Sequence, residues 1–341
     1  MNPENYPKKP VDYANYKPPE ERDKCCTKEV NPEGFMECET AEAYGENLDE
    51  FPCTEETFQQ AYNCVHCNAC ETVNSRYYLK RKLHREGFQA DDTLGMVHCY
   101  RQYGYPFARA KYRVKVPPGV PAESDTLLFL GCLGGIKVPE FAQHAIEYLL
   151  SRGVDFTLLE KETCSGVPLL DSGEEEVLAE CIQKNTEIFN SGRFKKVICL
   201  CPACYDVFHN PDVYPNLEPE IVFISDYLAP LTNPRSGSVS IQHLCQMEYR
   251  GRADIRPHVE QVLTESGFTL MDSEKMWCCG GGQGIMHIKK TIDAIARIRV
   301  HDFHGDILTT YCVSCYQILK EYARKERIAS QLVDTFKLLT E

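Results

Sequence analysis

The sequence predicts an α/β fold with two tandem parallel-sheet repeats, preceded by a small helical region and an extended N-terminal arm. Two observations support this prediction. From position 126 onward, short apolar runs of strand length alternate with longer segments of helical periodicity. Cysteines follow several of these runs, at spacings that recur in the two halves of this region. Because strands that alternate with helices form parallel sheets, we expect these cysteines to meet at one sheet edge, where such sheets bind ligands.

The first 52 residues are predicted to form the extended arm. Five prolines and three tyrosines lie between positions 3 and 19. This composition is typical of a polyproline-like segment that lies along another surface. We therefore expect residues 1–52 to wrap around a partner subunit.

The helical region is assigned to residues 53–120. Thr54 is predicted to cap a helix within residues 54–90, and two glutamates follow it in the first turn. Thr57 stands where a capping box would have glutamate or glutamine, so the box is expected to be incomplete. A proline-rich stretch at residues 117–121 marks the boundary with the next domain.

The two repeats are assigned to residues 121–236 and 237–341. In the first repeat, strands are expected at 126–131, 154–159, 195–200 and 221–224, and helices at 139–152 and 174–191. In the second repeat, strands are expected at 238–243, 268–271 and 306–311, and helices at 258–266 and 288–303. Glycines at 153, 192 and 267 are expected to end three of these helices.

Nine cysteines form two sets with matching spacing. The first repeat contains Cys132, Cys164, Cys201 and Cys204, and the second contains Cys245, Cys278, Cys279, Cys312 and Cys315. Cys132 and Cys164 are 32 positions apart, and Cys245 and Cys278 are 33 positions apart. One position differs, because Ser165 corresponds to Cys279. The first site therefore has four thiols and the second has five.

The cysteine content indicates metal binding. The chain has nineteen cysteines, no signal-peptide pattern within residues 1–52 and no apolar run of membrane-spanning length, so we expect a cytoplasmic protein with reduced thiols. Adjacent Cα atoms lie about 3.8 Å apart, closer than an ordinary disulfide allows, whereas an iron–sulfur cluster can bind Cys278 and Cys279 through different irons. Five thiolates suit an expanded or bridged cluster, and four suit a cubane.

A third motif lies in the helical region. The pattern Cys-x-x-Cys-x-x-Cys is typical of a [4Fe–4S] site and is formed by Cys64, Cys67 and Cys70. Asn74 stands where a ferredoxin motif has its fourth cysteine, so Cys99 is expected as the fourth ligand, with Cys53 as the alternative. Zinc is the alternative metal. One more cluster could use a further set at irregular spacing, namely Cys25, Cys26, Cys38 and Cys53.

The charge distribution excludes some functions. A net charge of −13 argues against nucleic-acid binding. Residues 71–115 nevertheless hold ten basic and four acidic side chains. They form either a solvated basic face or a docking surface for an acidic electron-transfer partner or an anionic substrate.

The glycines at 280–284 lack the lysine and the register of a nucleotide loop, and we expect neither flavin nor NAD in this chain.

Short motifs around the cysteines resemble a known family. They are FLGC at 129–132, CPACY at 201–205, HLC at 243–245, CCGGGQG at 278–284 and CVSC at 312–315. Together they resemble the CCG-domain (cysteine-rich domain) family over residues 126–340. This family includes the B and D subunits of heterodisulfide reductase and iron–sulfur subunits of glycerol-3-phosphate, glycolate and lactate oxidases.

The resemblance implies a set of cofactors. A non-cubane [4Fe–4S] cluster, with Cys278 and Cys279 at the catalytic centre, would lie on the five thiols Cys245, Cys278, Cys279, Cys312 and Cys315. In the family, the exposed iron of this cluster is thought to cleave a disulfide in two one-electron steps. A second cluster would lie on Cys132, Cys164, Cys201 and Cys204, and an N-terminal cluster on Cys64, Cys67, Cys70 and Cys99 or Cys53.

Three features depart from that family. Ser165 interrupts the first motif, which argues against a pair of non-cubane clusters. The usual His-Asp-Pro-Cys is replaced by His243-Leu244-Cys245. The N-terminal region has one cysteine motif, where fused D-type subunits have two ferredoxin motifs.

The function implied is that of an iron–sulfur subunit of an anaerobic multisubunit oxidoreductase similar to heterodisulfide reductase. Its partners would be ferredoxin-like and flavin-containing subunits and a small thiol or disulfide. Electrons would enter at the N-terminal cluster and reach the Cys278–Cys279 site directly or through the Cys132 site. One alternative is an electron-relay subunit of a flavin dehydrogenase or of a quinone-linked membrane complex, without disulfide chemistry. The other is a zinc-bound structural scaffold.

Overall fold

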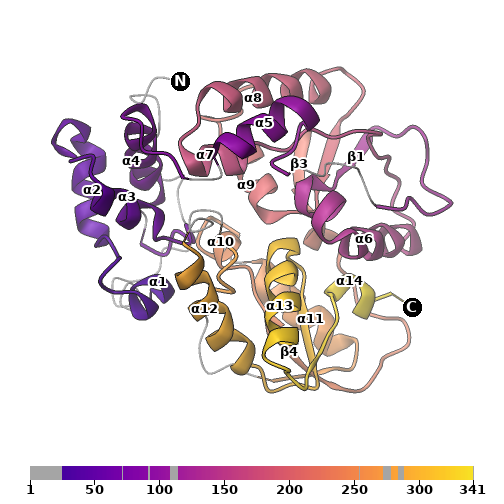
Figure 1. Ribbon diagram of the computed structural model, residues 1–341. Helices are drawn as coiled ribbons and strands as arrows, with labels where there is room; N and C mark the ends of the chain where they lie inside the picture. Colours follow the sequence, from indigo (N-terminus) through magenta and orange to yellow (C-terminus); the bar gives the residue numbers. More distant parts are fainter. Residues whose placement is uncertain are drawn as a thin grey trace.

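The computed structural model describes residues 25–70, 72–90, 93–107, 114–252, 254–271, 278–282 and 288–340. It contains two separate parallel sheets with helices around them and a helical N-terminal region. In Figure 1 the helices of residues 26–85 lie on the left, the first repeat lies at the upper right together with the helix of residues 93–103, and the second repeat lies at the lower right. The predicted α/β class with parallel sheets is confirmed.

The first sheet contains three parallel strands in the order β1 (Thr126–Phe129), β2 (Lys196–Cys199) and β3 (Glu220–Phe223). β1 and β2 are buried at their last three positions, as expected for strands covered on both faces. The strand expected at 154–159 is reduced to a single parallel bridge between Thr157 and Leu127.

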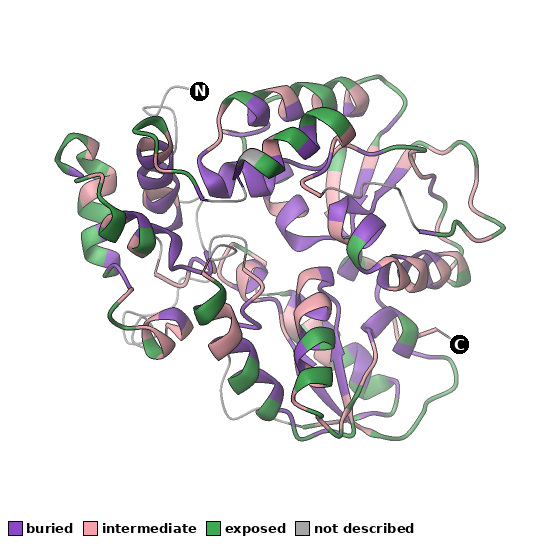
Figure 2. Cartoon of the chain, viewed as in Figure 1, coloured by how far each residue is buried: buried purple, intermediate pink, exposed green. Residues whose placement is uncertain are grey.

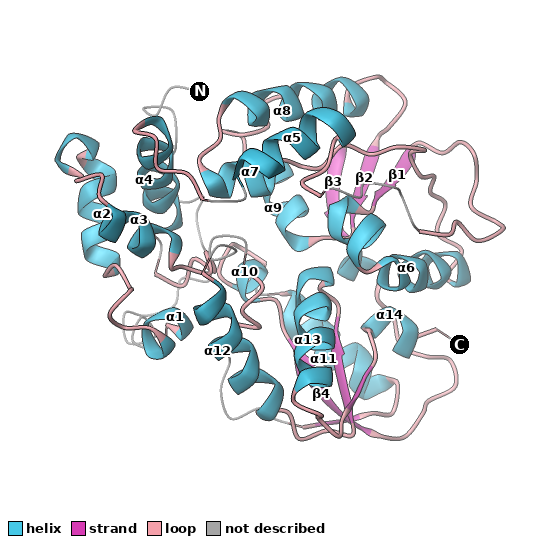
Figure 3. Cartoon of the chain, viewed as in Figure 1, coloured by secondary structure: helices cyan, strands magenta, loops and turns pink. Residues whose placement is uncertain are grey.

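The second sheet contains four parallel strands in the order β5 (Thr269–Leu270), β4 (Ser238–Gln242), β6 (Ile307–Thr310) and β7 (Gln331–Leu332). The first sheet has the same order if the bridge at Thr157 takes the place of β5. The two repeats therefore share one topology (Figure 3). β7 was not predicted, because two residues are too few to show a strand period.

Four helices of the repeats begin and end within three residues of their predicted positions, namely those at 139–151, 176–189, 255–265 and 289–301. No bounds were predicted for the others. In the first repeat the helices are α6 (Pro139–Ser151), α7 (Val167–Ser172), α8 (Glu176–Phe189) and α9 (Pro202–His209). In the second they are α10 (Cys245–Glu248), α11 (Ile255–Glu265), α12 (Lys289–His301), α13 (Val313–Lys325) and α14 (Thr335–Leu338). Figure 2 shows exposed residues on the outer faces of the helices, whereas the strands β1, β2, β4 and β6 are mostly buried.

The repeats are joined by a common core. The Phe141 ring of α6 lies 5.3 Å from the Tyr316 ring of α13 and 5.5 Å from the Phe336 ring of α14. His144 of α6 also contacts Asp334, with 2.6 Å between Nδ1 and Oδ2. Aromatic pairs of this kind add about 0.5–1.5 kcal/mol to the burial of their area. The position of one sheet relative to the other is therefore fixed by buried side chains.

The N-terminal region is helical from residue 26 onward. It contains α1 (Cys26–Val30), α2 (Cys38–Glu46), a 3-10 turn at Leu48–Glu50, α3 (Glu55–Tyr62), α4 (Val73–Arg85) and α5 (Thr93–Tyr103). The expectation of an extended arm is therefore wrong for residues 25–52, and residues 1–24 lie outside the described part. The physical reason is a small core in which Met36, Ala41 and Phe51 pack against Phe58 and Leu79.

Two details of this region differ from the prediction. The capping box at Thr54 is complete, because its N–H donates to the Thr57 hydroxyl (3.0 Å) and the Thr57 N–H donates to the Thr54 hydroxyl (3.2 Å). A threonine hydroxyl thus accepts the bond that glutamate usually accepts. The helix expected over 54–90 is interrupted by a turn in which His66 and Asn68 have φ angles of 53° and 75°. This turn, described at residues 63–70, carries the three cysteines of the N-terminal motif.

Within the ranges given above, no helix combines the length and the apolar character that a membrane crossing requires.

Candidate metal centres

Five thiols from three segments line one cavity of the second repeat. Cys245 begins α10 three residues after β4, and Cys312 precedes α13 two residues after β6. Cys315 lies in the first turn of α13, and Cys278 and Cys279 come from the glycine-rich loop. All five line a cavity of about 30 Å³, together with Leu244, Pro202 and Ser314. We call this group of five cysteines the five-thiol site.

Backbone amides donate hydrogen bonds to the sulfurs of this site. The Gly280 N–H donates to Cys278 Sγ (3.4 Å), the Gly281 N–H to Cys279 Sγ (3.3 Å) and the Cys315 N–H to Cys312 Sγ (3.4 Å). Hydrogen bonds from the Cys278 and Cys315 thiols, with the Gly281 amide, hold the pKa of Cys279 well below its ordinary value despite burial. Donors that stabilise thiolate sulfur are what an iron–sulfur cluster requires of its surroundings.

The glycine-rich loop approaches the rest of the molecule more closely than a side chain would allow. A Cβ at Gly281 would lie 2.8 Å from Ile318 Cγ1 and 3.2 Å from Cys279 Sγ. A Cβ at Gly282 would lie 2.2 Å from the carbonyl oxygen of Val65, in the N-terminal cysteine turn. The glycines therefore bring this loop against both the cysteines and the N-terminal region. Trp277, Gln283 and Gly284 lie outside the described residues.

Four thiols come together in the first repeat. Cys132, Cys164, Cys201 and Cys204 are all buried, and the Cys132–Cys164 and Cys201–Cys204 pairs are joined by hydrogen bonds that raise the pKa of Cys132 and Cys204. The Ser165 hydroxyl, at the position of Cys279, donates to Cys204 Sγ (3.1 Å). We call these four cysteines the four-thiol site.

A buried carboxylate supports the backbone next to the four-thiol site. Glu162 accepts hydrogen bonds from the N–H groups of Leu130 (2.8 Å) and Gly131 (2.9 Å), next to Cys132. A Cβ at Gly131 would lie 3.2 Å from Cys204 Sγ. Burial raises the pKa of Glu162 to about 7, although both amides oppose the rise. Glu162 therefore fixes the end of β1 and, through it, the position of Cys132.

The cysteines of the N-terminal turn face in two directions. Cys70 exchanges a hydrogen bond with Cys38, which lowers the pKa of Cys70 to about 5. Cys67 lies beside Cys245, and its burial with that neighbour raises its pKa. Cys26, at the start of α1, also faces the second repeat, because its Sγ accepts from the Cys278 N–H (3.3 Å).

The two residues expected as fourth ligand of the N-terminal turn lie elsewhere. Cys99 lines a cavity of about 450 Å³ together with Cys132 and Gly280–Gly282. Cys53 is close enough to Lys82 and Glu86 for their charges to act on its pKa, which burial raises. Cys38 and Cys26 were not assigned to these sites from the sequence. Their distance along the chain from Cys70 and Cys278 leaves no spacing signal that could have identified them.

The thiols present have the chemistry of iron–sulfur ligands. All nineteen cysteines lie in the described ranges, and all are free thiols. Among the described side chains, no three His, Cys, Asp or Glu residues converge in the way that one metal ion would require. A [4Fe–4S] cluster takes its thiolates on different irons, so its ligands are spread around a core. The residues present, buried thiols with amide donors, fit such a cluster.

A buried polar network joins the N-terminal turn to both repeats. His66 Nδ1 lies 3.0 Å from Asp171 Oδ1, and its Nε2 lies 3.1 Å from Lys80 Nζ. Because an ammonium group can only donate, Nε2 accepts and Nδ1 donates to the carboxylate. Burial, with the nearby Lys80 charge, lowers the pKa of His66 to about 3, so the ring is neutral. Arg250 of the second repeat donates to the carbonyl oxygen of His66.

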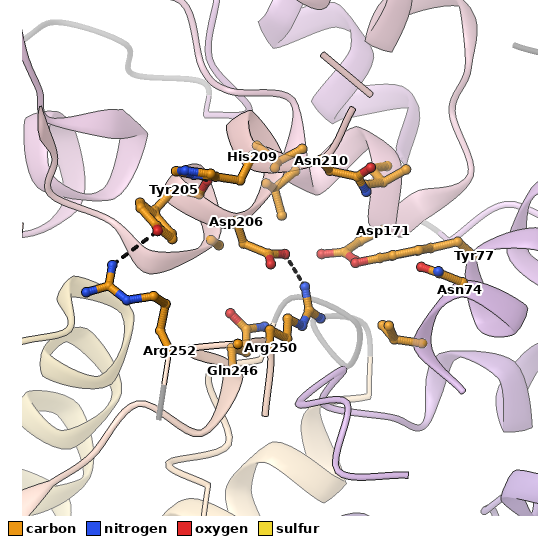
Figure 4. Close-up of a pocket in the computed structure, with 16 residues that line it drawn as sticks. Asn74, Tyr77, Asp171, Tyr205, Asp206, His209, Asn210, Gln246, Arg250 and Arg252 are labelled. Carbon is orange, nitrogen blue, oxygen red and sulfur yellow. Dashed lines mark hydrogen bonds and ion pairs between the residues drawn. The ribbon is translucent and has the colours of Figure 1, made fainter. Parts of the chain in front are cut away.

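This network borders a polar pocket of about 290 Å³ (Figure 4). Asp171, Asp206 and Arg250 point toward its centre, and Arg250 forms an ion pair with Asp206. Arg252 donates to the Tyr205 hydroxyl at the opposite end (3.1 Å). The pocket shares Ala203 and Gln246 with the cavity of the five-thiol site, so the two are neighbours.

The basic side chains of residues 71–115 are neither a single solvated face nor a single docking surface. Arg76, Lys80 and Arg81 are buried within α4. Arg85 and Arg101 are more exposed and form ion pairs with Glu175 and Glu176. Arg109, Lys111 and Arg113 lie outside the described residues.

A family comparison agrees with the repeated topology and the two thiol sites. The family model described as CCG, cysteine-rich domain, matches residues 126–209 and 239–320. The chain contains two CCG cysteine-rich domains. The first CCG match contains the four-thiol site, and the second contains all members of the five-thiol site.

Known proteins similar to this chain are iron–sulfur proteins or belong to oxidoreductases. An uncharacterized iron–sulfur protein of Methanococcus maripaludis is 23% identical over 312 residues, 82% of this chain and 63% of that protein. One subunit of the fumarate reductase (CoM/CoB) of Methanothermobacter marburgensis is 21% identical over 209 residues, 58% of this chain and 42% of that polypeptide. The chain thus spans less than two thirds of the length of these relatives.

A solved structure shares the fold of the CCG protein. The crystal structure of a hypothetical protein from Helicobacter pylori has a TM-score of 0.53 and 10% identity to this chain. The similarity covers 94% of this chain and 71% of the other. At this level of identity the similarity concerns the fold alone.

Proposed function

We propose that this chain is an iron–sulfur subunit of a multisubunit oxidoreductase, in which the five-thiol site holds a non-cubane [4Fe–4S] cluster. The observation that supports this most directly is the single cavity shared by Cys245, Cys278, Cys279, Cys312 and Cys315. The amide donors to three of these sulfurs suit anionic ligands. The descriptions of the relatives as iron–sulfur proteins and as an oxidoreductase subunit agree with the proposal.

The chain's own residues would hold and shield such a cluster. Bound there, the cluster supplies one-electron transfer and an iron that a substrate sulfur can approach. Four of the thiols are only 3–5% exposed, so bulk water is excluded from most of the site. Cys245 is the more exposed member. The cavity of about 450 Å³ reaches Gly280–Gly282 and Ser314, and it provides room for a small thiol or disulfide next to the site.

The route of electrons is proposed to start at the N-terminal turn. The backbone of Val65 contacts Gly282 of the glycine-rich loop, so the two cysteine-bearing segments touch. The four-thiol site would hold a cubane [4Fe–4S] cluster as a second relay. Reduction of a disulfide needs two electrons. A chain of clusters passes electrons one at a time, so it suits a donor that delivers them singly and in succession. Ferredoxin-like and flavin-containing subunits are the proposed partners.

Metal analysis and a turnover assay test the proposal. Protein prepared without oxygen is expected to contain iron and acid-labile sulfide and to give EPR signals after reduction. With a reduced dye as donor, the wild type is expected to reduce small disulfides, and Cys279→Ser is expected to lose this activity. Undiminished turnover by Cys279→Ser contradicts a catalytic five-thiol site. Zinc in place of iron and sulfide would leave only a structural scaffold.

A second candidate function is an electron-relay subunit without disulfide chemistry. Ser165 favours it, because its hydroxyl occupies the place of a fifth thiol and donates to Cys204. In that case the clusters are present and are reduced by the dye, but no disulfide is consumed by the wild type.

A further inference from the structure

A buried arginine in the N-terminal region has no carboxylate partner among the described residues. Arg76 of α4 has no exposed surface, and its guanidinium lies over the ring of Phe35 at 5.3 Å. Its Nη2 donates to the carbonyl oxygen of Met36 (2.7 Å). In the described part of the chain, its Nε and Nη1 have no hydrogen-bond partner. Burial of a cation without a counter-charge costs several kcal/mol, so the structure needs an anion at this place.

Four cysteines act electrostatically on the Arg76 guanidinium. Although burial opposes it, electrostatic interaction with Cys64, Cys70, Cys38 and Cys25 raises the pKa of Arg76. These four come from three segments: the residue before α1, the first residue of α2 and the two ends of the N-terminal turn. Among the described residues, these thiols are the ionisable groups that raise the pKa of Arg76 most strongly.

Hydrogen bonds hold these thiols in place. Cys64 Sγ accepts from the His66 N–H (3.4 Å), and Cys70 Sγ lies 3.0 Å from the Thr72 hydroxyl. Asn63 Nδ2 donates to the carbonyl oxygen of Gly34 (2.8 Å), which ties the turn to the segment that precedes Cys38. The N-termini of α2 and α4 lie next to Cys38 and Cys70, and helix N-termini favour negative charge.

We infer that Cys25, Cys38, Cys64 and Cys70 hold an iron–sulfur cluster whose buried counter-charge is Arg76. A thiolate-ligated cluster is an anion, and it supplies both the charge and the acceptors that the guanidinium requires. Cys67 then lies between this set and the five-thiol site, because Cys245, Cys70 and Cys25 all act on its pKa. Cys26 belongs to the contact with the five-thiol site, because its Sγ accepts from the Cys278 N–H. This inference rests on the proposed iron–sulfur function and assigns cysteines that the motif spacing left open.

Iron content tests the ligand assignment. Cys38→Ser, prepared without oxygen, is expected to lose one cluster of iron and acid-labile sulfide per chain and one EPR signal. Cys53→Ser is the matched control, because Cys53 lies beside Lys82 and Glu86, and it is expected to keep the full content. Full iron in Cys38→Ser overturns the inference while the proposed function stands. A wild type free of iron and sulfide would reject both.

A second variant tests the counter-charge without removing a thiol. Arg76→Met keeps an unbranched side chain but removes the positive charge, so reduction of the N-terminal cluster becomes less favourable. We expect its midpoint potential to fall by about 59 mV, which is a tenfold change in a one-electron equilibrium. The clusters that give the other EPR signals are expected to keep their midpoint potentials in Arg76→Met. Arg85 is an exposed arginine of the same helix, and Arg85→Met is expected to leave all midpoint potentials unchanged. Unchanged potentials in Arg76→Met, with full iron, overturn the role of Arg76.

Discussion

Replacement of Gly282 by alanine is expected to separate the glycine-rich loop from the N-terminal turn. The new Cβ would lie 2.2 Å from the carbonyl oxygen of Val65, whereas ordinary contacts of a Cβ begin at 3.4 Å. One backbone must therefore move by about 1.2 Å, the difference between these distances. Both chain segments that meet here, the glycine-rich loop and the N-terminal turn, carry cysteines. Neither segment can therefore move without displacing a sulfur. Overpacking of this kind typically costs about 1–3 kcal/mol.

Urea unfolding measures this cost. The midpoint for Gly282→Ala should fall by the equivalent of about 1–3 kcal/mol relative to the wild type, at an unchanged slope. Gly95→Ala in α5 is the control, because a Cβ there meets nothing within 4 Å. Alanine is the better helix former by about 1 kcal/mol, so the control should be neutral or slightly more stable.

The same variant tests the electron route. Electrons are proposed to pass from the N-terminal turn to the five-thiol site through this contact. If they do, Gly282→Ala should slow reduction of the five-thiol site and leave reduction of the N-terminal site unchanged. Rapid mixing with a reduced dye, followed by freeze-quench EPR, distinguishes the two. Equal midpoints and equal rates for Gly282→Ala and Gly95→Ala would refute the reasoning.

Three further predictions concern the two repeats. Phe141→Ala should cost about 3–5 kcal/mol, because it empties a fully buried ring site between the repeats, and an unfolding free energy within about 1 kcal/mol of the wild type in a denaturant titration would contradict this. The bond to Asp334 raises the pKa of His144 above its ordinary 6.5, so its stabilising effect is complete below pH 6.5 and is lost as the pH rises through the folded-state pKa. Unfolding midpoints measured from about pH 5 to 9 should show this loss in the wild type and not in His144→Gln, and parallel curves would count against it. Ser165→Cys places a fifth thiol where a hydroxyl lies 3.1 Å from Cys204 Sγ, so the EPR signal of the four-thiol site should change while the other signals persist. An identical set of spectra would show that position 165 does not reach the cluster.

Most of the repeat fold could be predicted because its signals are local. Strand-length apolar runs and helical periods of the right length follow one another, and glycines at 153 and 267 directly follow the C-caps of α6 and α11 with positive φ. The glycine at 192 lies two residues after the C-cap of α8. The placement of Cys245 and Cys312 after parallel strands follows from topology alone. For these elements, local propensity and tertiary packing favour the same structure.

The N-terminal region could not be predicted as well, because its structure depends on distant contacts. Nothing in the local pattern around Cys38 shows that it begins a helix beside Cys70, and the prolines before residue 20 suggested an extended chain throughout. The break between α3 and α4 needs left-handed backbone at His66 and Asn68. Neither position is a glycine, so the usual sequence signal for such a backbone is missing. The hydrogen bond from the Cys278 N–H to Cys26 Sγ joins residues 252 positions apart, so no sequence pattern indicates it.

The position of His66 has a consequence for how such proteins can be rearranged. This one residue contacts Lys80 of its own region, Asp171 of the first repeat and Arg250 of the second. A truncated chain that began after residue 120 would leave the Asp171 carboxylate without its imidazole donor and would uncover the surface around Arg250. The region before the repeats therefore cannot be exchanged as an independent domain. Grafting it onto an unrelated protein, or exchanging it for a ferredoxin, would require a new set of polar contacts on both repeats.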